Sequence, residues 1–369
     1  EAHQRALANH SSAEDGSGAS QFSVATVLYL LVPLLIIALG YGAWSLERER
    51  GTLRQVLSTQ ISRNTLFWGK ALALTLIITA LLLPAALIVI LTLIYTGGAD
   101  SQTLLRLAIL ALAVAIYWGA FGGLTLVSSA KAASSRTSLI TLVGVWGIFC
   151  LVIPRLSTEA SVLVSPLPSR AELARQVGTS LKHGIDGDTE REVAVESIVR
   201  DMMAEQGFEA GGLLVDEGYM AGLELQAEAQ WEDSIFDHHL SDLESQIHAQ
   251  ERVVSYAGFL SPFIAMQTLS TALCGTDYFH HQHFTRQAES YRKLMVSELN
   301  VAFSELAGVE GWEYKAGPEL WAKLPSFSYK PPALMEVLAH HTVSLLALLW
   351  WFVLAVFAAR YSATRVEVV

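Results

Sequence analysis

A polar segment between two long apolar runs limits most strongly what this chain can fold into. Residues 47–70 read ERERGTLRQVLSTQISRNTLFWGK and separate the apolar runs 22–46 and 71–95. A helix needs about 20 apolar residues to cross the hydrocarbon core of a bilayer. The two runs are therefore predicted to be membrane helices, joined by residues 47–70. This loop carries five basic and two acidic residues, which by the positive-inside rule places it in the cytoplasm.

Three more apolar runs extend this topology. The sequence predicts an all-α polytopic membrane protein with five transmembrane helices and a large, mainly helical extracytoplasmic domain. Residues 1–21 precede a helix that runs towards the cytoplasm, so we expect a sixth membrane helix before them in the full protein. In chain order the predicted segments are an extracytoplasmic segment 1–21, membrane helix 22–46, cytoplasmic loop 47–70, membrane helix 71–95, outer turn 96–103, membrane helix 104–128, cytoplasmic loop 129–136, membrane helix 137–154, outer domain 155–337, membrane helix 338–360 and cytoplasmic tail 361–369.

The predicted outer domain is strongly acidic. Residues 155–337 carry 13 basic and 28 acidic side chains, whereas the rest of the chain carries 11 and 7. This imbalance favours the extracytoplasmic side and makes nucleic acid an unsuitable partner. Apolar residues recur at helical spacing along 236–254 and 284–303, and residues 189–205 predict a further helix. Residues 328–332, SYKPP, predict an extended segment that returns the chain to the membrane.

A short amphipathic helix is predicted within the loop. Leu53, Val56 and Leu57 recur at helical spacing, while Arg54 and Ser58 lie on other faces. A cytoplasmic helix joined this closely to two membrane helices can transmit movement between them and a partner. We therefore expect a partner to dock on it.

The loop resembles that of type-2 ABC-exporter permeases, which reads roughly E-x-E-x-G-T-L-x-x-L-L-(S/T)-x-P-(I/V)-(S/T)-R…G-K. In that family the loop contains the coupling helix, which sits in a cleft of the ATP-hydrolysing subunit. Gln60 departs from the pattern, because the family commonly has proline there, and we expect a looser turn at that position. The resemblance implies that the residues coupling this chain to an ATPase are Glu47, Glu49, Gly51, Thr52, Leu53, Arg54, Leu57, Ser58 and Arg63.

Two further segments resemble a subset of these permeases that has a large outer domain between its last two membrane helices. They are residues 260–292, with LSPFIAMQ, LCGTDYFHHQHF and QAESYR, and the opening EAHQR at 1–5. The resemblance implies a permease subunit that exports a substrate across the inner membrane, with two copies of an ATPase subunit and an identical or homologous second permease. ATP and Mg would be bound by the ATPase subunits, and no cofactor is expected in this chain. Membrane lipid is expected around the apolar spans, and a periplasmic protein would be a further partner of the outer domain.

Two alternatives stay open. One is a mechanical transducer that drives a periplasmic partner through its outer domain. The other is a permease for a metal or metallophore, since all eleven histidines fall outside or at the outer membrane surface, and His280, His281 and His283 could supply ligands. No cysteine–histidine spacing typical of a structural zinc site occurs, so hydrogen-bonded or solvated histidines are the ordinary interpretation. Nucleotide-binding and hydrolase motifs are absent from the sequence, so we do not expect this chain to be an enzyme by itself.

Overall fold

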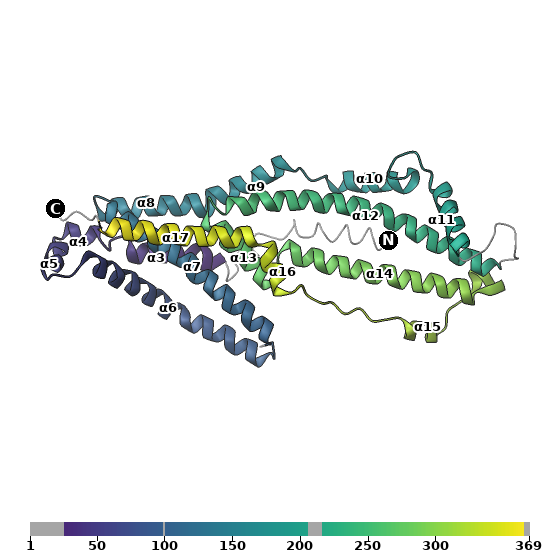
Figure 1. Ribbon diagram of the computed structural model, residues 1–369, viewed down its shortest axis with the longest axis horizontal. Helices are drawn as coiled ribbons and strands as arrows, with labels where there is room; N and C mark the ends of the chain where they lie inside the picture. Colours follow the sequence, from purple (N-terminus) through teal and green to yellow (C-terminus); the bar gives the residue numbers. More distant parts are fainter. Residues whose placement is uncertain (1–25, 99, 206–215, 365–369) are drawn as a thin grey trace. The chain divides into compact units, whose positions relative to one another are not determined.

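The computed structural model describes residues 26–98, 100–205 and 216–364 (Figure 1). Every regular element in these ranges is helical, which confirms the predicted helical class. The predicted segment 1–21 and the end of the predicted tail lie outside the described residues. Among the described residues, four helices are long and apolar enough to cross a membrane, so the chain is a multi-pass membrane protein: Val27–Glu49, Ser101–Lys131, Ser135–Val164 and Thr342–Ser362.

The chain divides into two compact units. Unit 1 contains the described residues up to Val164, then Gln250–His280 and the chain from Pro332 onward. Unit 2 contains Ser165–Ala249 and His281–Pro331. Three stretches of the predicted outer domain 155–337 therefore belong to the same compact unit as the membrane helices: 155–164, Gln250–His280 and 332–337.

Unit 1 begins with a π-helical turn, η2 (Val27–Leu31), followed by α3 (Val32–Gly40), α4 (Ser45–Glu49) and α5 (Thr52–Ser58). The next helix, α6 (Arg63–Tyr95), starts at Ser62, whose hydroxyl accepts the Thr65 N–H at 3.0 Å. Asp100 caps α7 (Ser101–Lys131) in the same way, accepting from the backbone N–H groups of Gln102 and Thr103. Ser62 and Asp100 are thus the N-caps of α6 and α7.

Three consecutive elements form one long helix after α7: α8 (Ser135–Gly147), the π-helical turn η3 (Ile148–Val152) and α9 (Ile153–Val164). The sequence predicted that this span ends at Pro154, but the helix continues for ten more residues. The π-helical turn just before Pro154 shifts the backbone hydrogen bonding, so the missing proline N–H does not break the helix.

A short apolar helix, α13 (Pro262–Cys274), lies in the core of unit 1. Met266 and Leu269 are fully buried there and belong to the same cluster as Tyr29 and Ile36 of the first membrane helix. Tyr29 also donates a hydrogen bond to Ser270 Oγ at 2.5 Å. A 13-residue apolar helix is too short to span a bilayer and is typical of a buried core helix or a re-entrant segment.

Helices α7 and α17 (Thr342–Thr364) pack closely through glycine. A Cβ atom on Gly119 would lie 2.7 Å from the Phe352 ring, and one on Gly123 would lie 2.9 Å from the backbone of Ala355. Small residues four apart allow two membrane helices to approach closely. Gly119 and Gly123 are therefore packing sites in this helix pair.

The part of unit 2 that the structure describes is built mainly from α-helices. They are α10 (Arg170–His183), α11 (Arg191–Glu205), much of α12 (Glu217–Ala257), most of α14 (Tyr278–Leu306) and α15 (Pro318–Lys323). Within unit 2, α12 and α14 are tied by ion pairs, including Lys293–Asp237 at 2.6 Å and Arg286–Glu244 at 2.6 Å. Residues 324–333 are non-helical, as predicted for SYKPP.

Candidate functional site

The loop between α4 and α6 is a short, sharply turned helical unit. Gly51 lies between α4 and α5 with φ of 71°, a left-handed conformation that glycine adopts without steric cost. The Thr52 hydroxyl donates to the Glu47 carbonyl oxygen at 3.2 Å, which ties the start of α5 back to α4. The predicted helix 51–58 is therefore present as α5.

Charged residues of α4 brace this loop against the neighbouring helices. Lys70 Nζ of α6 lies 2.5 Å from Glu47 Oε1. Arg48 donates to the carbonyl oxygens of Ala130 and Ala132 at the end of α7. Glu49 accepts hydrogen bonds from both the backbone N–H and the hydroxyl of Ser135, each at 2.8 Å.

Leu53 fixes the other side of α5. Its side chain is 1 % exposed and lies in an apolar cluster with Trp44, Phe67, Leu126, Ala130 and Ala359. Leu57 is half-buried against the same cluster. The apolar face of α5 that the sequence predicted is therefore turned towards the protein's own core.

The opposite face of the loop is exposed. Arg54, Ser58 and Arg63, three of the predicted coupling residues, lie on this surface. Two large apolar residues that are not among the predicted coupling residues are also exposed, Ile61 at 42 % and Trp68 at 49 %. We call Arg54, Ser58, Ile61, Arg63 and Trp68 the exposed loop face.

The backbone at Gln60 has a conformation that proline cannot adopt. Its φ is 64°, in the left-handed region. The proline ring fixes φ near −65°, so a proline cannot occupy this turn as it is formed here. The expected looser turn is instead a turn of a different backbone conformation.

The predicted histidine candidates have separate surroundings. Both ring nitrogens of His280 are engaged, Nδ1 by Asp277 and Nε2 by Arg106 Nη1 at 3.4 Å. His283 contacts the Gln287 amide at 3.1 Å, and His281 is exposed. Among the described residues, no group of three metal-ligand atoms includes any of these histidines. The geometry gives no support to a metal site at these positions.

Asp277 instead organises a polar network that the sequence reading missed. Its side chain is 7 % exposed, and its two oxygens lie against the rings of His280 and His341, the latter at 2.7 Å. Burial raises the pKa of the Asp277 carboxyl, but the hydrogen bonds from His341 and His280 outweigh burial and lower the pKa to about 2. The carboxyl is therefore ionised at neutral pH.

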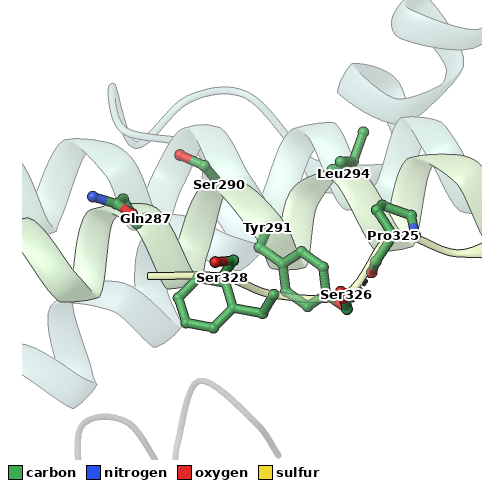
Figure 2. A pocket seen from close by; sticks show the side chains of 8 residues that line it. Gln287, Ser290, Tyr291, Leu294, Pro325, Ser326 and Ser328 are labelled. Carbon is green, nitrogen blue, oxygen red and sulfur yellow. Dashed lines mark hydrogen bonds between the residues drawn. The ribbon is translucent and has the colours of Figure 1, made fainter. Parts of the chain in front are cut away.

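Unit 2 carries an open groove of about 320 Å³ beside α14 (Figure 2). An extended segment forms its second wall and is fastened to α14, because the Tyr291 hydroxyl donates to the Pro325 carbonyl oxygen at 2.8 Å and the Gln287 amide pairs with both backbone groups of Lys330. The lining is aromatic, aliphatic and hydroxylic, and it carries no charged side chain: Gln287, Ser290, Tyr291, Leu294, Pro325, Ser326, Phe327 and Ser328.

Comparison with known proteins identifies one family. Residues 218–330 match a family described as a domain of unknown function (DUF3526). The match covers less than a third of the chain and includes α14 and the groove beside it. No curated protein and no solved structure matches the chain. The matching region is thus similar to a family whose description assigns no activity.

Proposed function

We propose that this chain is the membrane-spanning subunit of an ATP-driven ABC transporter of the type-2 exporter class. The observation that carries the proposal is the loop between α4 and α6. There, the short helix α5 has an exposed outer face, and the loop is bonded and packed against the ends of α6, α7 and α17 of unit 1. The sequence resemblance of this loop to the coupling loop of such permeases supports the same conclusion.

The contacts of the loop suggest how force would pass through it. Leu53 packs on Phe67 of α6 and Leu126 of α7, while Arg48 bonds the end of α7. Interiors are close-packed, so a push on α5 would displace these helix ends together rather than compress the loop. Docking energy would come from the exposed loop face, with Trp68 and Ile61 as apolar anchors and Arg54 and Arg63 as charge contacts.

The proposal includes a fuller topology than the four spans among the described residues. Helix α6 covers the second apolar run and would be the fifth span. The α4–α6 loop would face the cytoplasm and unit 2 the extracytoplasmic side of the inner membrane. Two permease subunits, identical or homologous, would bind two ATPase subunits, and those subunits would hold ATP and Mg.

The test is co-purification of the full-length protein in detergent, followed by mass spectrometry and an ATPase assay. We expect an ATP-binding protein in equal amount. The double variant Arg54→Glu with Ile61→Asp should lower its recovery about tenfold, because both changes alter exposed contacts without touching the core. Gln102→Glu, an exposed change at the opposite end of α6 and α7, is the matched control and should retain the partner.

Two outcomes would contradict the proposal. One is a chain that purifies without any ATP-binding protein. The other is a folded double variant that keeps its partner and its ATP turnover. Substitution of Leu53 is unsuited to this test, because a loss of binding could then follow from damage to the buried cluster.

A further inference from the structure

Four residues from separate parts of unit 1 meet at the N-terminal ends of α7 and α17. Arg106 lies in the second turn of α7, and Asp277 lies in the turn between α13 and α14. His280 lies in the first turn of α14, and His341 lies between α16 (Leu334–His340) and α17. The Asp277, His280 and His341 side chains are each 7–8 % exposed. We call these four residues the polar network.

The hydrogen bonds of the polar network define where its protons are. An ionised carboxylate can only accept, so His280 Nδ1 donates to Asp277 Oδ1 and His341 Nε2 donates to Asp277 Oδ2. The His280 backbone N–H donates to Asp277 as well, at 3.2 Å. Arginine can only donate, so His280 Nε2 accepts from Arg106 Nη1 at 3.4 Å. One nitrogen that donates and one that accepts make His280 a neutral imidazole in this arrangement.

Arg106 also makes a second hydrogen bond, to the backbone of Pro332. Its Nη2 donates to the Pro332 carbonyl oxygen at 2.9 Å, at the point where the chain re-enters unit 1 ahead of α16. His341 connects the start of α17 to the α13–α14 turn through Asp277. The network therefore joins α7, the α13–α14 turn and the α16–α17 segment.

We propose that the polar network is a proton-sensitive clamp, which holds the starts of α7 and α17 together while His280 is neutral and releases Arg106 when His280 takes up a proton. A proton on His280 can go only to Nε2, because Nδ1 already carries one. Asp277 would keep its bond to the resulting imidazolium, whereas Arg106 would face a second donor of the same charge. Loss of this contact frees the arginine and weakens its bond to Pro332.

Other titratable groups lie near the polar network. The His340 ring lies 4.9 Å from the His341 ring and pairs with Glu251 of α12 at 4.0 Å, at the partly exposed edge. Glu336 of α16 accepts from the backbone N–H of Ala333 at 3.3 Å. Cys274 of α13 is hydrogen-bonded with Ser270. This inference does not depend on the transporter proposal.

The experiment is hydrogen–deuterium exchange of the full chain in lipid nanodiscs, read at residues 332–341 and at the first turns of α7. After correction for the intrinsic pH dependence of exchange, we expect about tenfold faster exchange near pH 5.5 than near pH 7.5. His280→Gln offers one amide donor to Asp277 and one carbonyl acceptor to Arg106 but cannot be protonated. This variant should therefore lose the acid response. His281→Gln, at the exposed neighbouring position, should keep it.

Two results would overturn the clamp. One is an unchanged exchange rate in the wild type between these pH values, and the other is a full acid response in His280→Gln. If His280→Gln does not fold, Arg106→Met gives a second measurement, because it removes the contact that the proton would break. Exchange at 332–341 should then be fast at both pH values, and a remaining acid response would also refute the proposal.

Discussion

The two ends of the α7–α17 helix pair are held by different chemistry. At their N-terminal ends, Arg106 and His341 belong to a network centred on the buried Asp277 carboxylate. At their C-terminal ends, Leu126 of α7 and Ala359 of α17 pack with Leu53 in an apolar cluster. The first end is held by charged and titratable side chains, whereas the second is built around packed apolar volume, to which Arg48 adds hydrogen bonds at the end of α7.

This difference separates two ways in which the same helix pair can respond. A packed apolar cluster transmits displacement but is insensitive to pH, because it contains nothing to titrate. A buried polar network is rigid while every member is satisfied, and it loses several contacts when one member changes its charge. The loop end is therefore suited to mechanical input from a partner, and the opposite end to chemical input from the solution.

The largest expected effect comes from breaking the apolar end. Leu53→Asp should lower the free energy of unfolding by roughly 4 kcal/mol, because it places an unpaired carboxylate in a side-chain site that is 1 % exposed. The measurement is thermal or denaturant unfolding of the detergent-purified protein. Gln55→Asp, on the exposed face of the same helix, should change stability by about 0.5 kcal/mol at most. Equal losses in the two variants would show that Leu53 does not fasten the loop.

The apolar end of the α7–α17 pair was predicted from the sequence far better than the end with the polar network. The helix 51–58 and the apolar spacing of Leu53 and Leu57 were visible, because both are local patterns. The sequence did not show that this apolar face points into the protein, because Leu126 and Ala359, against which it packs, lie in other membrane helices. An apolar face on a short helix fits an internal core as well as a partner's cleft, and only the packing distinguishes the two.

The polar network could not be predicted from the sequence, for a different reason. Asp277 and His280 are three residues apart at the start of a helix, a local signal that could have been noticed. His341 lies 64 residues from Asp277, and Arg106 lies 174 residues from His280, so no sequence pattern joins them. The helix α13 was missed because it is a short apolar run inside an acidic region, although PFIAMQTLSTALC is apolar enough to indicate a buried element.

Acidification should weaken the polar end selectively. The folded-state pKa of Asp277 is about 2 against an ordinary value of 3.8, so its stabilising contribution is complete above about pH 4 and is lost as pH falls towards 2. The difference corresponds to roughly 2 kcal/mol of unfolding free energy. Unfolding measured from about pH 5 to pH 2 should show this loss in the wild type but not in Asp277→Asn. Leu53→Ala, which weakens the apolar end, should keep the wild-type pH dependence.

The smallest effect is expected at the close approach of α7 and α17 at Gly123, which lies between the two ends and nearer the apolar one. Gly123→Ala puts a Cβ atom 2.9 Å from the Ala355 backbone, so α7 and α17 must separate slightly. Overpacking of this kind costs about 1–3 kcal/mol, partly offset by the better helix propensity of alanine, which leaves a net loss of about 1 kcal/mol. Gly122→Ala is the matched control, because its Cβ would meet nothing nearer than Leu74 at 3.8 Å, and it should be neutral or slightly stabilising.

The same variant also tests whether the two ends act on one rigid pair. If α7 and α17 move as a unit, the separation at Gly123 should raise hydrogen exchange both at residues 332–341 and in the α4–α6 loop. Faster exchange at one end alone would mean that the helix pair yields locally at Gly123. The polar network and the apolar cluster would then work independently, and a push at α5 would not reach the Asp277 end.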